Sequence, residues 1–412
     1  MMSGAKKRVP KRRFKEFLNA GDWEQRKLRN LLEQPITDGP HETPELYNSG
    51  IPFISVDAIV DNKIDFTKMR GYISKEYDDI CAKKYKPQIN DVYLVKSGAT
   101  IGKVAIVDTY DDFNIWSPLA AMRCGSITNP YFLYILLQTQ DLQSQVFNKA
   151  SHGTQPNLSM RQLEQFTCKV PKIEEQKLIS RFLKQLDDVI TLHQRKLDKL
   201  QATKKALLQE MFPEEGQDKP KRRFKGFADA WEQRKLDEVC NVYDGTHQTP
   251  RYTNSGVMFI SVEDIETLES NKYISEEDFK SEFKVFPEYG DILLTRIGDV
   301  GSANVILDEI KRAYYVSLAL LKPKNINSLF LLALLGSSSV QSEIWRRTLH
   351  IAFPKKINKN EINKVIVKQP SIPEQEKIGK LFFSLDQTIT LYQRKLDKLK
   401  NLKQAYLNEM FV

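Results

Sequence analysis

Ile190-Thr-Leu-His-Gln-Arg-Lys-Leu-Asp-Lys-Leu200 recurs as Ile389-Thr-Leu-Tyr-Gln-Arg-Lys-Leu-Asp-Lys-Leu399, 199 positions later (389 minus 190), with a single difference. Two further segments recur in the same order along the chain. Trp23-Glu-Gln-Arg-Lys-Leu28 returns as Trp231-Glu-Gln-Arg-Lys-Leu236, and Lys11-Arg-Arg-Phe-Lys15 returns as Lys221-Arg-Arg-Phe-Lys225. A chain written as two half-copies predicts two similar domains related by a pseudo-twofold axis, with one operation performed at two places.

The repeated stretch belongs to a long apolar pattern in steps of four and three, which is typical of a coiled coil. The pattern predicts one long helix over residues 172–212 and a second over 371–412, each about 55–60 Å long at ~1.5 Å per residue. The residues expected to form the seam and a partner-binding face are Leu183, Leu186, Ile190, Leu197 and Leu200 in the first helix and Phe382, Leu385, Ile389, Leu396 and Leu399 in the second.

Chain connectivity favours an antiparallel pairing of these helices, because a parallel pairing would require the connection at 213–230 to span the whole rod. Lys204 and Lys403 interrupt the seam at matched positions. They either set the register of the pair or extend from its edge into solvent. His193, which matches Tyr392, is expected to be structural.

Short apolar strands bounded by glycine and proline turns, together with helical patches at 130–147 and 328–346, predict an α+β fold for each half. Each globular domain is expected to combine helices with a mixed, mostly antiparallel sheet. The predicted divisions are a basic, exposed N-terminal tail (1–22), domain one (23–171), the first long helix (172–212), a hinge linker (213–230), domain two (231–370) and the second long helix (371–412).

The composition suits a folded protein with an acidic partner. Of the 412 residues, 41% are hydrophobic, enough for a core in each half, and the net charge of +9 favours nucleic acid over membrane as the partner. The four cysteines are scattered, which indicates reduced structural thiols and no metal site. No apolar run approaches the ~18 residues of a membrane span, so a cytoplasmic location is expected.

Ser97-Gly-Ala-Thr-Ile-Gly-Lys103 resembles a phosphate-binding loop but fails its spacing. Its glycines are one residue too close, Val104 stands where a magnesium-binding Ser or Thr belongs, and the second copy lacks the lysine. Nucleotide hydrolysis is therefore not expected. Lys96, Lys103 and Arg296 remain candidates for DNA phosphate contacts, with an ordinary hairpin as the alternative.

His41 and His247 occupy the same place in a repeated Asp-Gly-x-His-x-Thr-Pro element. No nucleophile or metal-ligand partner recurs with them, which disfavours acid–base or metal chemistry. Each histidine either orders its loop or contacts nucleic acid. Thr246 and Arg251 of the second copy are further candidates for DNA contacts.

Ser151-His-Gly-Thr-Gln-Pro-Asn157 places short hydrogen-bonding side chains on a turn, a composition suited to reading base edges. The candidates here are His152, Thr154, Gln155 and Asn157. The parallel stretch of the second half, Leu349-His-Ile-Ala-Phe-Pro-Lys-Lys356, has no clear counterpart of that turn and offers Lys355 and Lys356 instead. Either stretch can equally be a solvated loop.

The duplicated Trp-Glu-Gln-Arg-Lys-Leu starts, the Asp-Gly-x-His turns and the Glu-Met-Phe helix ends (Glu210–Phe212 and Glu409–Phe411) resemble the specificity subunit of type I restriction–modification systems. The resemblance covers essentially the whole chain. It implies two target-recognition domains that each read one half of a bipartite, asymmetric site in double-stranded DNA. It also implies that the coiled coil sets the spacer and docks two methyltransferase (modification) subunits.

The same resemblance places the chemistry elsewhere. The methyltransferase subunits would bind S-adenosylmethionine and methylate adenine, and motor–nuclease (restriction) subunits would use ATP and magnesium. The chain itself lacks an Asn-Pro-Pro-Tyr or Asp-Pro-Pro-Tyr motif and a Walker sequence with a helicase set. We therefore expect a non-catalytic subunit with no cofactor of its own.

Two other classes of function stay open on the sequence. A two-headed coiled-coil adaptor would bind proteins insensitively to salt and would lack DNA affinity. A DNA enzyme with an unfamiliar site would show activity as a purified single chain.

Overall fold

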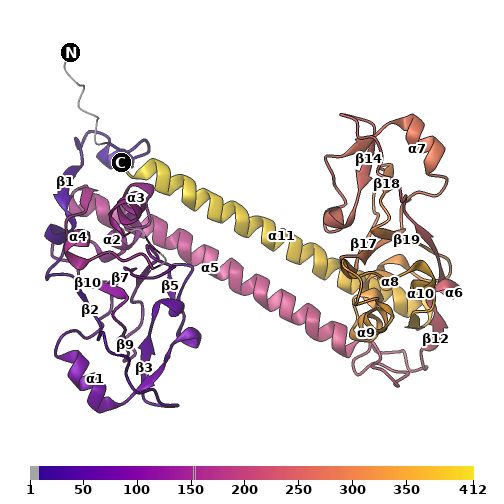
Figure 1. Ribbon diagram of the computed structural model, residues 1–412, viewed down its shortest axis with the longest axis horizontal. Coiled ribbons are helices and arrows are strands. Elements are labelled where there is room, and N and C mark those ends of the chain that lie inside the picture. Colours follow the sequence, from indigo (N-terminus) through magenta and orange to yellow (C-terminus); the bar gives the residue numbers. More distant parts are fainter. Residues whose placement is uncertain (1–8, 152, 154) are drawn as a thin grey trace. The chain divides into compact units, whose positions relative to one another are not determined.

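The computed structural model describes residues 9–151, 153 and 155–412 (Figure 1). The chain divides into two compact units. The first unit comprises the residues up to Leu192 together with Leu396–Val412, and the second comprises His193–Lys395. Both long helices therefore contribute one part to each unit.

The first unit begins with short elements and ends in a long helix. Its helices are α1 (Lys75–Ala82), α2 (Pro130–Leu136), α3 (Gln140–Lys149), α4 (Met160–Glu164) and the start of α5 (Ile173–Glu210). Its strands are β1 (Glu24–Lys27), β2 (Thr37–Asp38), β3 (Ile51–Ile54), β4 (Ile59–Val60), β5 (Lys63–Ile64), β6 (Gly71–Ile73), β7 (Val92–Val95), β8 (Val104–Ile106), β9 (Asn114–Ile115), β10 (Leu119–Met122) and β11 (Thr167–Val170). Single 3-10 turns lie at Lys15–Phe17, Leu28–Leu31, Val56–Ala58 and Phe66–Lys68.

The second unit repeats this order except for the β4–β5 pair, which has no counterpart among its described residues. Its helices are α6 (Leu236–Val239), α7 (Glu276–Glu282), α8 (Ser328–Leu335), α9 (Ser338–Arg347), α10 (Lys359–Asn363) and the start of α11 (Ile372–Met410), with a 3-10 turn at Val262–Asp264. Its strands are β12 (Glu232–Lys235), β13 (Cys240–Asp244), β14 (Val257–Ile260), β15 (Tyr273–Ile274), β16 (Ile292–Ile297), β17 (Asp299–Val305), β18 (Arg312–Tyr314), β19 (Leu318–Pro323) and β20 (Ile366–Gln369).

The two units share one sheet topology. An antiparallel four-stranded sheet has the order β2-β10-β7-β8 in the first unit and β13-β19-β16-β17 in the second. A three-stranded sheet, β6-β3-β9 or β15-β14-β18, contains one antiparallel and one parallel pairing. The predicted α+β fold with a mixed, mostly antiparallel sheet is confirmed.

Each unit has two apolar cores, one on each side of its four-stranded sheet. In the first unit Leu94 and Ala120 belong to the core under α2, α3 and α5, whereas Tyr93 and Ala121 belong to the core shared with β9. This division follows from the alternation of side chains along a strand. In the second unit Leu294 and Leu293 divide in the same way.

The Trp-Glu-Gln-Arg-Lys-Leu repeats form β1 and β12, each paired with the last strand of its unit, β11 or β20. The tryptophan before each strand is buried, Trp23 at 1% exposure and Trp231 at 4%. Each contacts the phenylalanine that follows a long helix: Trp23 packs edge-on against Phe411 and Trp231 against Phe212. The strongest repeats in the sequence thus close each unit onto the end of a long helix.

The long helices contain 38 and 39 residues, within one or two residues of the predicted ends. All ten predicted seam residues are buried or half-buried. In the first unit Phe182 contacts Tyr406 and Asp187 pairs with Lys403, so the helices run in opposite directions there. In the second unit His193 contacts Tyr392 and Lys204 pairs with Asp386, with the same consequence.

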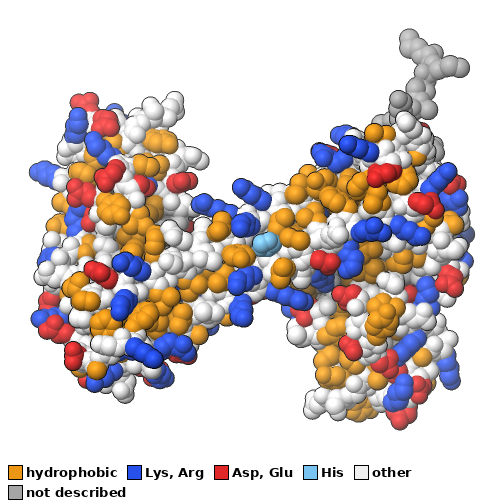
Figure 2. All heavy atoms as spheres, turned by 180° about the vertical axis from the view of Figure 1, so that it is seen from behind, with side chains coloured by type: hydrophobic (Ala, Val, Ile, Leu, Met, Phe, Trp, Pro, Cys, Tyr) orange, Lys and Arg blue, Asp and Glu red, His pale blue; other side chains and the backbone are white. Residues whose placement is uncertain are grey.

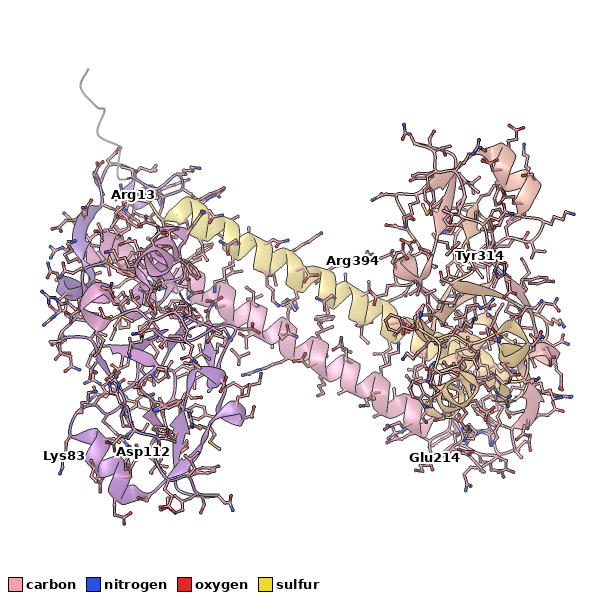
Figure 3. All side chains as sticks on the ribbon, viewed as in Figure 1. Arg13, Lys83, Asp112, Glu214, Tyr314 and Arg394 are labelled. Carbon is pink, nitrogen blue, oxygen red and sulfur yellow. The ribbon has the colours of Figure 1, made fainter. Side chains whose placement is uncertain are left out.

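The basic segment before Trp23 differs from the predicted exposed tail. Its Arg13 side chain is only 4% exposed and binds Glu175 of α5 through two hydrogen bonds of 2.7 Å. Arg12 binds Glu409 near the end of α11, and Phe14 packs against Phe182. The segment is therefore docked on both long helices; Figure 3 labels Arg13 at this place.

The segment 213–230 repeats this docking in the second unit, so it is more than a hinge. Arg223 binds Glu374 of α11 at 2.6 and 2.7 Å, and Arg222 binds Glu210 at the end of α5. Glu374 is fully buried. Lys-Arg-Arg-Phe is thus a structural clasp, which explains its duplication.

Candidate nucleic-acid interface

Four segments of the first unit meet beyond the ends of the strands of its four-stranded sheet, and we call them the first loop cluster (38–41, 96–98, 116–118 and 155–158). Backbone hydrogen bonds join them. Lys96 N–H donates to the Pro118 carbonyl (2.8 Å) and Leu158 N–H donates to the Lys96 carbonyl (2.8 Å). Gly98 N–H donates to the Pro156 carbonyl (3.0 Å). The cluster is therefore one backbone-linked surface.

The second unit builds a second loop cluster (244–247, 296–298, 315–317 and 349–357) with the same bonds. Arg296 N–H donates to the Ser317 carbonyl (2.9 Å), and Ile357 N–H donates to the Arg296 carbonyl (2.9 Å). Gly298 N–H donates to the Lys355 carbonyl (2.8 Å). Residues 156–158 thus have a backbone counterpart at 355–357, although the two sequences share no pattern that predicts it.

The glycine of each Asp-Gly-x-His element is required by a close approach of two backbones. A Cβ on Gly39 would lie 1.8 Å from the Ile115 carbonyl oxygen, and one on Gly245 would lie 2.4 Å from that of Tyr315. Both distances are far below van der Waals contact. A larger residue would push the histidine loop away from the rest of its cluster.

The aspartate of the same element holds a basic residue from the next loop. Asp38 is fully buried, with its carboxylate in contact with Lys84 and 3.4 Å from the Lys96 ammonium. Asp244 pairs with Arg296, whose Nε also donates to the Ile357 carbonyl (3.2 Å). Lys96 and Arg296 are only 8% and 6% exposed.

That burial changes how Lys96 and Arg296 can act. We predicted that they present their charge to a DNA phosphate. In the structure each charge is instead held by an aspartate, because a buried cation needs a partner that replaces water. The two side chains tie the Asp-Gly element to the end of β7 or β16.

The remaining predicted residues lie at or near the surface of the two clusters. His41 is exposed, with its Nε2 3.2 Å from an Asp38 carboxylate oxygen, and Thr246 is half-buried. Lys103 is exposed on the turn after β7 and donates to the Ile59 carbonyl (3.3 Å). The other exposed members are Gln155, Asn157, His247, Arg251, Lys355 and Lys356, whereas His152 and Thr154 lie outside the described residues.

Sequence reasoning missed the two aspartates and one apolar pair. Asp38 and Asp244 were noted only as neighbours of a histidine, although repetition of Asp-Gly was a signal for them. Ile351 and Phe353 were not proposed as functional, yet they are 99% and 104% exposed in the second loop cluster. A hydrophobic residue in an otherwise polar loop was the available signal.

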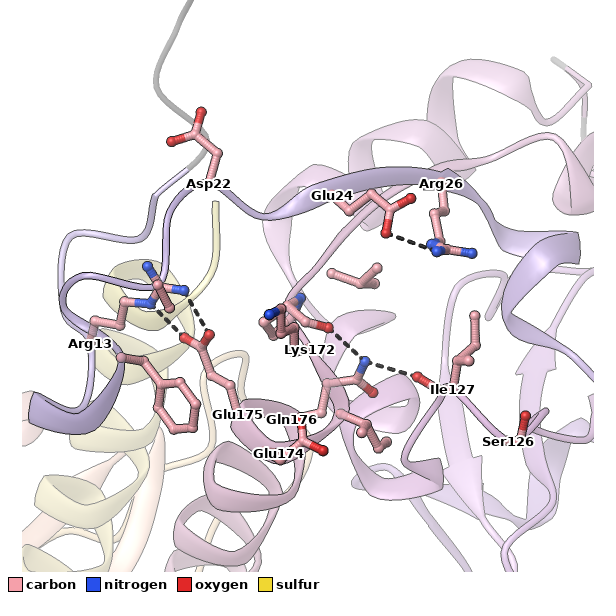
Figure 4. Close-up of a pocket in the computed structure, with 15 residues that line it drawn as sticks. Arg13, Asp22, Glu24, Arg26, Ser126, Ile127, Lys172, Glu174, Glu175 and Gln176 are labelled. Atoms are coloured by element: carbon pink, nitrogen blue, oxygen red, sulfur yellow. Dashed lines mark hydrogen bonds and ion pairs between the residues drawn. The ribbon is translucent and has the colours of Figure 1, made fainter.

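A cavity of about 480 Å³ lies apart from the loop clusters, beside the first turn of α5 (Figure 4). The Arg13 and Glu175 pair forms part of its wall, and that pair's hydrogen bonds raise the pKa of Arg13 against the opposing effect of burial. Gln176 donates from its side-chain amide to the carbonyls of Ile127 (3.1 Å) and Pro171 (2.9 Å). These groups join the sheet, the clasp and the helix to one another.

Residues 9–151, 153 and 155–412 contain no group of three or more His, Cys, Asp or Glu side chains placed to hold a metal ion. Across those same residues, no helix has an apolar stretch long enough to cross a membrane.

Two α+β units of one topology, each with a loop cluster and each joined to both long helices, define a duplicated recognition protein. The chain belongs to the family of the type I restriction modification DNA specificity domain, whose family model matches residues 20–202 and 228–401. The two matched ranges coincide with the two half-copies of the sequence.

Relatives with curated names agree with the family. Over 198 residues the chain is 30% identical to a Methanocaldococcus jannaschii protein with the provisional name type I restriction enzyme MjaX specificity subunit, covering 46% of this chain and 45% of that protein. Over 170 residues it is 30% identical to the type I restriction enzyme EcoBI specificity subunit of Escherichia coli, covering 40% and 35%. The chain thus matches less than half the length of these two relatives.

A solved structure has the same fold over nearly the whole chain. The crystal structure of the type I restriction–modification system S subunit from M. genitalium matches with a TM-score of 0.69, covering 98% of this chain and 99% of that chain at 16% identity. At that identity the likeness concerns the fold.

Proposed function

We propose that this chain is the DNA-reading subunit of a type I restriction–modification complex. The first loop cluster reads one half of a bipartite, asymmetric site in double-stranded DNA and the second cluster reads the other half. Catalysis belongs to partner subunits, with S-adenosylmethionine on the methyltransferase subunits and ATP and magnesium on the motor–nuclease subunits.

The observation that carries the proposal is a shared backbone with different side chains. Both clusters use the same hydrogen bonds between the same loops, from Lys96 and Gly98 in one and from Arg296 and Gly298 in the other. Apart from His41 and His247, which match, their exposed side chains differ. Two sites with one frame and different surfaces suit the reading of two different short sequences.

The buried ion pairs support this reading by fixing the loops. A side chain that discriminates bases must be held within a fraction of an ångström, which rigid supporting contacts achieve. Asp38 with Lys96 and Asp244 with Arg296 supply such contacts beneath the exposed residues. We assign these four residues to positioning.

Exposed basic residues account for affinity. Lys103, Arg251, Lys355 and Lys356 lie on or beside the two clusters, and neutralising a phosphate with each would release counterions. Binding should therefore weaken steeply with salt. Gln155, Asn157, His41 and His247 remain candidates for base contacts, at ~1–3 kcal/mol of discrimination per good pair.

The long helices suit spacing and docking. The seam residues are buried or half-buried, which leaves other side chains of these helices for the methyltransferase subunits. Figure 2 shows hydrophobic side chains on the molecular surface among lysines and arginines. On the long helices the exposed large hydrophobic residues are Val189, Leu192, Ile372, Leu391 and Leu402.

The test is sequencing of the DNA modified in cells that express this chain with its cognate methyltransferase subunit. We expect a methylated split motif that disappears when this gene is deleted. Methylation that is unaffected by the deletion would refute the proposal. Salt-insensitive binding to proteins without DNA affinity would favour a two-headed adaptor instead.

A further inference from the structure

The loop between α9 and α10 of the second unit exposes two large apolar side chains completely. Ile351 is 99% exposed and Phe353 is 104% exposed. Burying such a side chain away from water stabilises a protein by roughly 1.5–3 kcal/mol. Because both side chains are fully exposed, the folded chain lacks that stabilisation. Exposed apolar residues in a loop cluster point to an occupant that covers them.

The base of this loop is fixed although its tip is exposed. Leu349 N–H donates to the Lys356 carbonyl (2.8 Å), which closes the loop into a hairpin. Gly298 N–H donates to the Lys355 carbonyl, and buried Thr348 donates its hydroxyl to the Ile344 carbonyl (2.7 Å). The tip therefore projects from a supported frame.

The surroundings of the tip are basic and aromatic. Lys355 lies over the ring of Trp345 at 5.2 Å, and the His350 ring lies 4.0 Å from the same indole. Neither Lys355 nor Lys356 forms an ion pair with a described residue. An apolar tip flanked by free cations fits a polyanion with flat apolar surfaces inside it, which describes stacked DNA bases.

We propose that Phe353, supported by Ile351, is a wedge that inserts into a base step of the half-site read by the second unit. Phenylalanine and isoleucine are residues that other proteins insert between bases, and the two lysines would hold the flanking phosphates. This inference rests on the proposed function. It adds that the second half-site is recognised partly through the deformability of one step.

The first unit offers no equivalent tip among its described residues at 151, 153 and 155–157, where the exposed side chains are polar. It does provide a matched control. Tyr110 is 89% exposed, but its loop contains Asp108, Asp111 and Asp112, which repel phosphate. Comparing Tyr110 with Phe353 therefore distinguishes the effect of an exposed aromatic side chain by itself from the effect of one that lies among basic residues.

The experiment uses the assembled complex and its split site, identified by sequencing, with 2-aminopurine placed at each step of both half-sites in turn. Unstacking a 2-aminopurine raises its fluorescence. Apart from the adenines that the methyltransferase subunits extrude for methylation, we expect one step of the second half-site to brighten on binding and no step of the first. Phe353→Ala should abolish the brightening and weaken binding by roughly ten- to a hundredfold, as loss of a base–aromatic stack does.

Phe353→Leu should restore part of the brightening, and Tyr110→Ala should change neither signal. Because Phe353 packs against nothing, its variants should keep the wild-type unfolding midpoint. A wild-type complex that binds its site without brightening any step of the second half-site other than the extruded adenine would overturn the wedge while leaving the proposed function intact. Loss of assembly with the methyltransferase subunit in Phe353→Ala would overturn it in favour of a protein contact. Failure of the wild type to select any split site would refute the proposed function itself.

Discussion

At the scale of single residues, the most repeated side chains serve the framework. Arg13 with Glu175 and Arg223 with Glu374 are bidentate pairs, and both glutamates are at most 1% exposed. Each pair lies where the clasp meets the first turn of a long helix. A buried pair of this kind is costly to break from one side only, because the remaining charge stays desolvated.

Glu175→Gln should therefore destabilise the first unit by roughly 3 kcal/mol, since Arg13 would keep its charge without the carboxylate that binds it through two hydrogen bonds. The measurement is urea unfolding followed by the fluorescence of the four tryptophans. Arg12→Gln is the matched control, because Arg12 forms its ion pair at the surface with a 57% exposed side chain, and it should cost far less. If both variants lost the same free energy of unfolding, burial of the ion pair would not determine how much its removal destabilises the protein.

Residue patterns in the sequence located the candidate interface. They could not distinguish residues that contact DNA from residues that hold the loops in position. The sequence places Lys96 and Arg296 after a strand and before a glycine, which is typical of a phosphate contact. Their burial depends on Asp38 and Asp244, which lie 58 and 52 positions away (96 minus 38, 296 minus 244). Pairings across such separations are set by the fold, and no local pattern encodes them.

At the scale of elements, the sequence predicted long periodic segments well and short ones in outline. The helical patch at 130–147 is two helices, because Thr139 is extended (φ −66°, ψ 152°) and starts a new helix at Gln140. Gln143 fixes that break by donating to the carbonyls of Leu137 (2.7 Å) and Gly102 (2.9 Å). Gln341 does the same in the second unit, with Leu335 and Gly301.

Helix α1 shows that equivalent elements can be held by different chemistry. Its Asp78 is fully buried and accepts hydrogen bonds from Lys86 (2.7 Å), Lys75 (2.9 Å) and Asn114 (3.0 Å). In the second unit α7 instead packs Phe279, which is 4% exposed, into an apolar core. One architecture thus tolerates an ion cluster or an aromatic ring at this junction.

The Asp78 cluster predicts an acid-sensitive first unit. Burial alone would raise the pKa of Asp78, but hydrogen bonds from Lys86, Lys75 and Asn114 outweigh it and lower the pKa below the ordinary 3.8. Because folding lowers the pKa of Asp78, its ionised carboxylate stabilises the folded state at pH values above its pKa in the unfolded chain. That stabilisation is lost as pH falls below about 4. Unfolding midpoints in guanidinium between pH 5 and 2.5 should fall more steeply for the wild type than for Asp78→Asn. If the midpoints of the wild type and of Asp78→Asn fell equally with pH, Asp78 would not be a source of the acid sensitivity.

At the scale of the whole chain, the duplication explains why the fold could be predicted and the two surfaces could not. Matched residues lie on strands, clasps and long helices, whose packing restricts them. Outside the Asp-Gly-x-His elements the loop clusters keep only the backbone frame, so Pro156 and Asn157 in one unit correspond to Lys355 and Lys356 in the other, and the Phe353 tip lies just before those lysines. The bases that these loops select depend on geometry that no repeat within the sequence records.

The division between a matched framework and two different loop clusters also predicts the function of the long helices in recognition. Lysine and arginine side chains such as Arg394 project from them (Figure 3), while Lys204 and Lys403 each pair with an aspartate of the other helix and so hold the register. Duplicating Thr191–Leu197 in α5 and the matched Thr390–Leu396 in α11 adds seven residues to each helix and preserves the seam pattern.

At ~1.5 Å per residue the duplication lengthens each helix by about 10 Å, which equals about three base pairs at ~3.4 Å each. Sequencing of modified DNA should then report both half-sites unchanged, separated by a spacer about three base pairs longer. Duplication in α5 alone should lose modification, because Lys204 and Asp386 can no longer align while Lys403 and Asp187 stay paired. An unchanged spacer in the doubly extended chain would mean that the helices do not measure the distance between the half-sites, and that the spacing is set by the partner subunits.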